Sequence, residues 1–198
     1  LTVDGKQYGA AYAYYQIGVY YRKDIFEKLG INEPKTWDEF LWVCAMLKNN
    51  DVEPIAIGTK YLWTAAAWFD YLNIRINGID FHMRLMAGQE SYEDMRLDDV
   101  FDHWKELVEP GYFLKDHQTY SWQDAIAPMN NGDAAMYLIG NFIVPFFDDG
   151  GSVDNIGFFQ FPMIKDGIGV FEDAPTDTIH IPSGAKNKED ARKFLRFL

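Results

Sequence analysis

Short apolar segments alternate with capped helical segments along most of this chain, and this alternation limits the folds open to it. The strand-like runs are residues 1–21, 54–57, 134–139, 156–162 and 178–181. Strands that alternate with helices favour an α/β architecture with a mainly parallel sheet. In such sheets ligands bind beyond the carboxyl ends of the strands. The loops after Ile57 and Ile139, and the segment before Thr178, are therefore candidate binding regions.

The clearest local signals are those that begin and end helices. Asp24 to Leu29 is typical of a short helix, and Gly30 supplies the left-handed residue that ends it. Thr36 and Glu39 have the T-x-x-E spacing of a capping box, which predicts a helix to about Lys48.

Further helices are predicted from polar residues that could cap them. Asp98 is the predicted N-cap of a helix that runs to about Glu109, and Ser121 that of a helix over 122–129. Pro128 lies inside the second of these, so that helix is expected to end early or kink. Asn187 opens a final amphipathic helix.

The charge of the chain argues against two classes of partner. With 18 basic and 30 acidic residues, the formal net charge is −12, and no basic stripe is present. Nucleic-acid binding requires clustered lysine and arginine, and peripheral membrane binding a basic amphipathic helix. No apolar run reaches the roughly 18 residues of a membrane-spanning helix.

The residues that could support catalysis or metal binding are scattered. Cys44 is alone and lies in an apolar helical context, where a thiol is usually a small hydrophobic side chain. The histidines show no metal-ligand spacing, and no catalytic or phosphate-binding motif is present; they are His82, His103, His117 and His180. Asp148-Asp149 before Gly150-Gly151 predicts a solvated turn. Nothing in the sequence therefore indicates a cofactor or a metal.

A series of motifs in a fixed order resembles one known family. Gly18-Val19-Tyr20-Tyr21-Arg22-Lys23-Asp24 is followed by Gly30 and then by Pro34-Lys35-Thr36-Trp37-Asp38-Glu39. Matching segments follow at residues 122–136, 140–142, 156–162 and 181–198. Together they resemble the extracellular solute-binding proteins of ABC sugar importers, the group that includes maltose-binding-protein-like receptors.

The resemblance implies a type II periplasmic-binding-protein-like fold of two lobes that are joined by a hinge and close on a ligand. Residues 1–17 would form a strand that crosses between the lobes, 18–169 the second lobe, and 170–198 the return toward the first. The chain would then lack the N-terminal part of the first lobe and the C-terminal helices.

The function implied by the resemblance is that of an extracytoplasmic sugar receptor, periplasmic or membrane-anchored, without catalytic activity or cofactor. It would act as a monomer and deliver a carbohydrate to an ABC permease by hinge closure. Two alternatives stay open. A carbohydrate-active enzyme would need two carboxylates that face each other across a cleft, and an adhesion or scaffold module would bind no small molecule.

Sugar capture requires aromatic faces for stacking and planar polar side chains for the hydroxyl groups. Aromatic residues make up 17% of the chain. Tyr61, Trp63 and Trp68 follow a strand end, where the family contributes aromatic contacts, although Trp68 also fits a packing role. Asn141 and Phe142 follow another strand end, and Phe142 matches a stacking position of the family.

The remaining candidate contacts lie on the predicted crossings and on one helix. They are Tyr12, Tyr15, Gln16, Trp122 and Asp177. Alternation along a strand places Tyr12 and Tyr15 on opposite faces, and the sequence does not decide which face lines the cleft. Trp122 begins a predicted helix and fits a packing role as well.

Overall fold

The computed structural model describes residues 1–147 and 153–198. It divides the chain into two compact units. Unit 1 consists of Leu1–Gln16 and Ala174–Leu198, and unit 2 consists of Ile17–Asp173. The predicted solvated turn at residues 148–151 lies outside the described residues.

Unit 1 contains two strand pairs and one helix. Its elements are β1 (Thr2–Val3), β2 (Lys6–Gln7), β3 (Ala10–Tyr14), β8 (Thr176–Ile179) and α7 (Lys188–Phe197). β1 pairs with β2, and β3 with β8, both antiparallel. The side chain of Asn187 accepts a hydrogen bond from Asp190 N at 3.3 Å, which confirms the predicted start of α7.

Unit 2 is built around one sheet with helices before and after its strands. Its strands are β4 (Ile17–Arg22), β5 (Glu53–Ala56), β6 (Ala134–Gly140) and β7 (Ile156–Phe159). Its α-helices are α1 (Lys23–Leu29), α2 (Trp37–Lys48), α3 (Trp63–Asn77), α4 (Ile79–Met86), α5 (Arg96–Val108) and α6 (Ile126–Asn131). Among the described residues it also has three short 3-10 helices: η1 (His117–Thr119), η2 (Asn141–Phe146) and η3 (Val153–Asn155).

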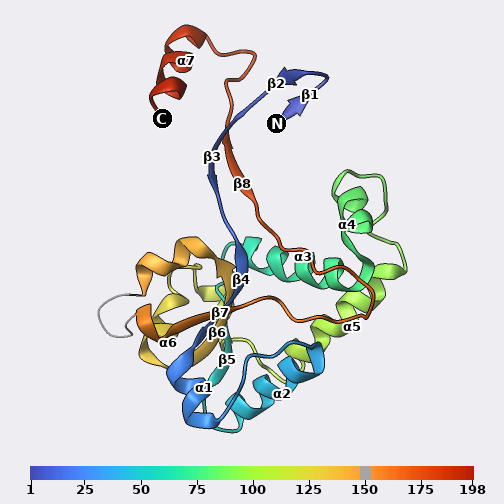
Figure 1. The fold of residues 1–198 in the computed structure, drawn as a ribbon, viewed down its shortest axis with the longest axis vertical. Coiled ribbons are helices and arrows are strands. Elements are labelled where there is room, and N and C mark those ends of the chain that lie inside the picture. The colour runs from blue at the N-terminus through green and yellow to red at the C-terminus, as the bar shows by residue number, and fades with distance from the viewer. Residues whose placement is uncertain (148–152) are drawn as a thin grey trace. The chain divides into compact units, whose positions relative to one another are not determined.

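The sheet of unit 2, whose strands lie among the helices of that unit in Figure 1, has the strand order β5-β6-β4-β7. β5 and β6 are parallel, whereas β4 is antiparallel to both β6 and β7. The prediction of a mainly parallel sheet is therefore wrong, although the α/β class is right. That prediction rested on the alternation of strands and helices, which is typical of sheets whose strands all run in the same direction. Ile17 at the start of β4 pairs with Gly140 at the end of β6, so the two strands run in opposite directions.

Both faces of this sheet are covered, which is why every residue of β4 and β6 is buried. Val19 and Leu138 pack into a core with residues of α2, α3 and α5. Tyr20 and Tyr137, which point to the opposite face, pack with residues of α6 and η2. A strand buried on both faces is mostly apolar along its length, as β6 is and as β4 is up to Arg22 at its end.

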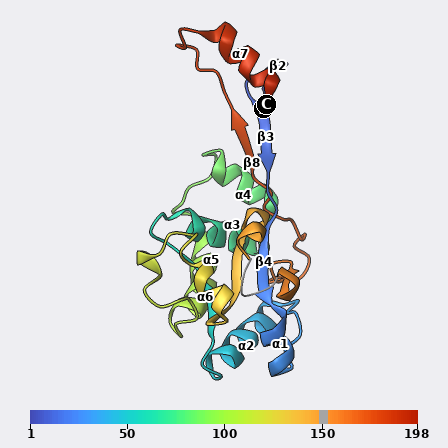
Figure 2. The ribbon, with the colours of Figure 1, turned by 90° about the vertical axis from the view of Figure 1, so that its left-hand side faces the viewer.

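The two helices at the far end of β4 begin and end as the sequence predicts (Figure 2). Gly30 follows α1 in the left-handed conformation with φ 65°. The capping box of α2 is complete, because Glu39 N donates to Thr36 Oγ1 at 3.4 Å and Glu39 Oε2 accepts from Thr36 N at 3.2 Å.

Two helix starts differ from the prediction. Asp98 is not the N-cap of α5, which begins two residues earlier at Arg96 and places Asp98 in its first turn. There Asp94 Oδ1 accepts from Arg96 N at 3.0 Å, so the turn before the helix is stabilised by another carboxylate.

α6 begins at Ile126 rather than Trp122, and Pro128 is its third residue. Proline has no N–H and clashes with the preceding turn of a helix, but the first turn tolerates it. The helix therefore starts late instead of ending early.

The single cysteine has the predicted packing role. Cys44 is fully buried on α2, and burial raises the pKa of its thiol. Of the helices in the described part of the chain, none has the length and apolar character needed to cross a membrane.

Candidate functional site

Three aromatic side chains from separate segments of unit 2 form one cluster. The Trp122 and Phe142 ring centroids are 5.1 Å apart, and those of Trp63 and Phe142 are 6.2 Å apart. Trp63 and Trp122 are separated by 6.4 Å. Phe146 extends the cluster, with its ring 5.5 Å from that of Trp122. We call Trp63, Trp122, Phe142 and Phe146 the aromatic cluster.

The sheet brings these segments together. Because β5 and β6 are parallel neighbours, their carboxyl ends lie at the same edge. Trp63 is the first residue of α3, which follows the loop after β5, and Phe142 comes two residues after β6. The loops after Ile57 and Ile139, which the sequence indicates as candidate binding regions, thus lie side by side.

The segment that carries Trp122 is held against the loop after β5 by close backbone contact. A side chain at Gly58 would place its Cβ 2.0 Å from Ser121 O, so only glycine fits there. Lys60 N donates to Tyr120 O at 3.0 Å, and Thr64 Oγ1 donates to Gly58 O at 2.6 Å.

Buried and local hydrogen bonds fix Trp122 further. The hydroxyl of the fully buried Tyr137 donates to Trp122 O at 3.2 Å. Ser121 N donates to Asp124 Oδ2 at 2.9 Å, and Asp124 N donates to Ser121 Oγ at 3.1 Å. The hydrogen bonds from Ser121 hold the pKa of the Asp124 carboxyl below its usual value.

The aromatic cluster is exposed enough to receive a ligand. Trp63 is 38% exposed and Trp122 and Phe142 are half-buried. Tyr61 and Asn141 are exposed in the two loops that carry Trp63 and Phe142. This arrangement presents apolar ring faces beside a phenol and an amide, which is the chemistry needed to hold a ring with several hydroxyl groups.

Trp68 does not share this surface. It is 1% exposed and packs edge-on against Phe113 and Phe161, at centroid distances of 5.3 and 5.6 Å. Its indole N–H has no hydrogen-bond partner among the described residues. The structure thus assigns Trp68 the packing role, because its side of α3 faces the core.

The candidate residues on the segments predicted to cross between lobes belong to unit 1. The hydroxyl of Tyr15 donates to Asp177 Oδ2, so two of these candidates are direct partners. The hydrogen bond to Asp177 is the main cause of the raised pKa of Tyr15. Tyr12 is 63% exposed and Gln16 is exposed as well.

Sequence reasoning missed Phe146 and Tyr137. Phe146 stands four residues after Phe142 within η2, a spacing that could have suggested a shared surface. Tyr137 lies inside an apolar strand, and nothing in the sequence shows that its hydroxyl would reach Trp122.

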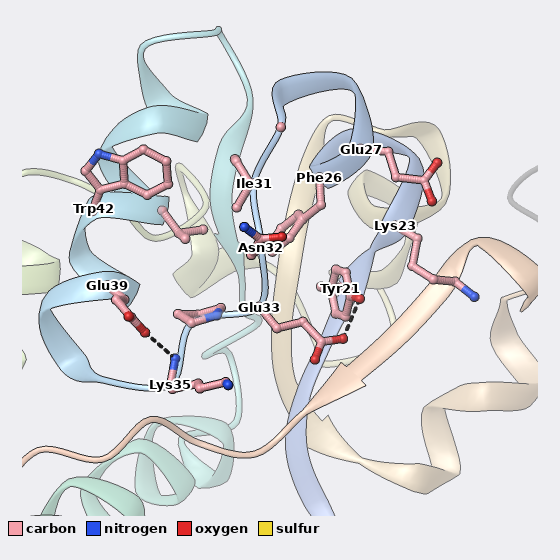
Figure 3. A pocket seen from close by; sticks show the side chains of 13 residues that line it. Tyr21, Lys23, Phe26, Glu27, Ile31, Asn32, Glu33, Lys35, Glu39 and Trp42 are labelled. Carbon is pink, nitrogen blue, oxygen red and sulfur yellow. Dashed lines mark hydrogen bonds between the residues drawn. The ribbon is translucent and has the colours of Figure 1, made fainter.

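A cavity of about 770 Å³ lies at the other end of β4, between α1 and α2 (Figure 3). Trp42 forms one wall and Phe26 part of the floor. Tyr21 and Glu33 both line this cavity, and Tyr21 OH donates to Glu33 Oε1 at 2.6 Å. Burial together with that hydrogen bond raises the pKa of Tyr21 to about 12. The cavity presents one exposed indole among charged side chains, so it offers fewer stacking surfaces than the aromatic cluster.

Metal chemistry finds no support in the part of the chain that the structure describes. No group of three or more His, Cys, Asp and Glu side chains there could hold a metal ion. The histidines make separate contacts, such as that of His117 Nδ1 with Thr59 Oγ1 at 2.7 Å and that of His82 Nδ1 with Asn73 Nδ2 at 3.1 Å.

Comparisons with known proteins agree on one family. The family model of bacterial extracellular solute-binding proteins matches residues 1–198. An uncharacterized ABC transporter extracellular-binding protein of Pyrococcus horikoshii is 31% identical over 182 residues, which is 91% of this chain and 40% of that protein. The multiple sugar-binding protein of Streptococcus mutans is 26% identical over 186 residues, 91% of this chain and 44% of that protein.

A solved structure is similar over nearly the whole chain. The bacterial solute receptor AcbH, described as having an exclusive preference for β-D-galactopyranose, matches with a TM-score of 0.88 and 33% sequence identity. The match covers 98% of this chain and 50% of that one. This chain thus spans about half or less of the length of these three proteins. The periplasmic-binding-protein-like fold implied by its motifs is confirmed. The chain belongs to the family of bacterial extracellular solute-binding proteins.

Proposed function

We propose that this chain forms part of the sugar-contacting surface of an extracytoplasmic receptor that delivers a carbohydrate to an ABC importer. The observation that carries the proposal is the aromatic cluster, in which Trp63, Trp122 and Phe142 meet at the carboxyl ends of two parallel strands. Exposed aromatic faces beside polar side chains favour a neutral sugar over an ionic solute.

The relatives support the same ligand class. The Streptococcus mutans relative is named for binding sugars, and AcbH is described as a galactopyranose receptor. By analogy the receptor would be a monomer that works outside the cytoplasm, periplasmic or membrane-anchored. The ligand would select a closed form of the two lobes, and the ABC permease would recognise that form.

The proposed contacts fall into two groups. In unit 2 the rings of Trp63, Trp122 and Phe142 stack on the sugar, while Tyr61 and Asn141 bind hydroxyl groups. In unit 1 the proposed contacts are Tyr12, Tyr15, Gln16 and Asp177. Trp68 is left out because it is buried in the core.

The carboxylate beside the aromatic cluster does not suit glycoside hydrolysis. A glycosidase needs a carboxylic acid that stays protonated near neutral pH, and this requires a raised pKa. Asp124, which lies two residues after Trp122, has its pKa lowered by Ser121 instead. This carboxylate is therefore unsuited to the role of general acid.

The test is a titration of the full-length protein with a panel of neutral mono- and oligosaccharides, followed by calorimetry and thermal unfolding. A bound sugar at 100 times its Kd should stabilise the protein by about 2.7 kcal/mol, with the sugar recovered unchanged by chromatography. A sugar phosphate and a polyamine serve as ionic controls. Hydrolysed sugar would favour the enzyme alternative, and binding of an ionic control alone would overturn the proposed ligand class.

A further inference from the structure

The chain enters and leaves unit 2 at one place. Ile17 is the first residue of the unit and Asp173 is its last. Ile17 N donates a hydrogen bond to Asp173 O at 3.0 Å, so the two ends of the unit are neighbours. Both covalent links between unit 2 and the residues before and after it therefore start at this pair.

One buried side chain binds both of these ends. Tyr71 of α3 is fully buried, and its hydroxyl donates to Ile17 O at 2.5 Å. The same hydroxyl accepts from Asp173 N at 3.2 Å and lies 2.9 Å from Glu172 Oε2. Its ring stacks on Phe161 with a centroid distance of 4.8 Å and an interplanar angle of 19°. Tyr71 therefore joins the entering and the leaving segments to α3.

A second side chain of α3 holds the leaving segment. Arg75 is 1% exposed and its Nη2 donates to Glu172 Oε1 at 2.8 Å. Its guanidinium also donates to Phe161 O at 3.1 and 3.2 Å and to Phe171 O. The ion pair and the hydrogen bonds to these carbonyl groups hold the last residues of unit 2 against α3.

The same helix carries part of the aromatic cluster. Trp63 begins α3, and Tyr71 follows eight residues later, which corresponds to about 12 Å along a helix axis. Ile17 pairs with Gly140, two residues before Phe142, so the anchored ends lie at the edge of the sheet that holds the cluster. One rigid element thus links the aromatic cluster to the points where the chain leaves the unit.

We propose that Tyr71 is a positioning residue that fixes both crossing segments to α3, and so sets their geometry relative to Trp63. The inference rests on the proposed function, because the position of the crossing segments matters for binding only if the two lobes close around a sugar. With both segments anchored, hinge motion begins outside unit 2, and the aromatic cluster meets the ligand in the same place in every closure event. Without the anchor, more open arrangements would compete with the closed one.

The test uses Tyr71→Phe in the full-length protein, since phenylalanine keeps the stack on Phe161 and loses only the hydroxyl. Tyr21→Phe is the matched control, because Tyr21 is also buried and its hydroxyl also contacts a glutamate carboxylate, but at the other end of β4. Dyes at Lys28→Cys and Glu189→Cys report the distance between α1 and α7 by single-molecule energy transfer. Cys44 is fully buried and should not compete for the label.

We expect Tyr71→Phe to broaden the distance distribution without ligand and to weaken sugar binding about fivefold, the effect of one lost hydrogen bond. Tyr21→Phe should change neither. If Tyr71→Phe lowers the melting temperature but keeps the wild-type distribution, its role is structural and the proposal is overturned. The distance distribution without ligand tests the role of Tyr71 even if no sugar binds the wild-type protein. A failure of the wild type to bind any sugar would count against the proposed function alone.

Discussion

Replacing Arg75 by methionine is expected to lower the free energy of unfolding of unit 2 by about 3 kcal/mol. Arg75 is 1% exposed and donates to Glu172 and to two backbone carbonyls, those of Phe161 and Phe171. Methionine fills much of the same volume, but it leaves these acceptors without a donor. The Glu172 side chain is 18% exposed and can be partly rehydrated, so the lower end of the range for a broken buried ion pair applies.

Urea unfolding followed by tryptophan fluorescence measures this loss. The matched control is Arg84→Met, since Arg84 also pairs with a glutamate, Glu90 at 2.9 Å, but its side chain is 46% exposed. An exposed pair of this kind is worth about 0–1 kcal/mol. Equal losses in the two variants would show that the buried network around Arg75 does not stabilise the unit.

Replacing Trp63 by alanine is expected to weaken sugar binding by the full-length protein about 30-fold, or about 2 kcal/mol. The indole is packed against Trp122 and Phe142 and is 38% exposed, so its removal takes away a stacking face. Because Trp63 is at the first position of α3 and not in the core, the fold should persist. Trp63→Phe should keep most of the affinity, since it retains an aromatic face.

Trp42→Ala is the matched control for this measurement. Trp42 is 53% exposed on α2 and lines the cavity at the other end of β4. Calorimetric titration should give the wild-type Kd for Trp42→Ala and a weaker one for Trp63→Ala. Weaker binding by Trp42→Ala than by Trp63→Ala would instead place the sugar site at the cavity beside Trp42.

The features predicted from sequence are those that depend on neighbouring residues. The Thr36–Glu39 capping box and Gly30 after α1 involve contacts within four residues, and both are present. The direction of β4 relative to β6 could not be predicted in this way, because it depends on where the chain enters unit 2. That entry is held by Tyr71, which is 54 residues away from Ile17 in the sequence.

In the candidate site, as in the fold, the features that depend on residues distant in the sequence could not be predicted. Trp63 and Trp68 follow the same strand and belong to the same helix, yet five residues of helix turn them about 140° apart. One lies in the aromatic cluster and the other in the core, and only the packing of Phe113 and Phe161 against Trp68 distinguishes them. The loops that carry Trp63 and Phe142 could be predicted to converge, because both follow strands of one sheet.

The most direct test of the proposed sugar site is a crystal structure of the full-length protein with the sugar that binds best in the panel. We predict a sugar ring in contact with Trp63, Trp122 or Phe142, at the roughly 3.5–4 Å carbon–carbon distance of van der Waals contact. A sugar bound elsewhere on unit 2, for example beside Trp42, with the aromatic cluster in contact only with solvent, would contradict it.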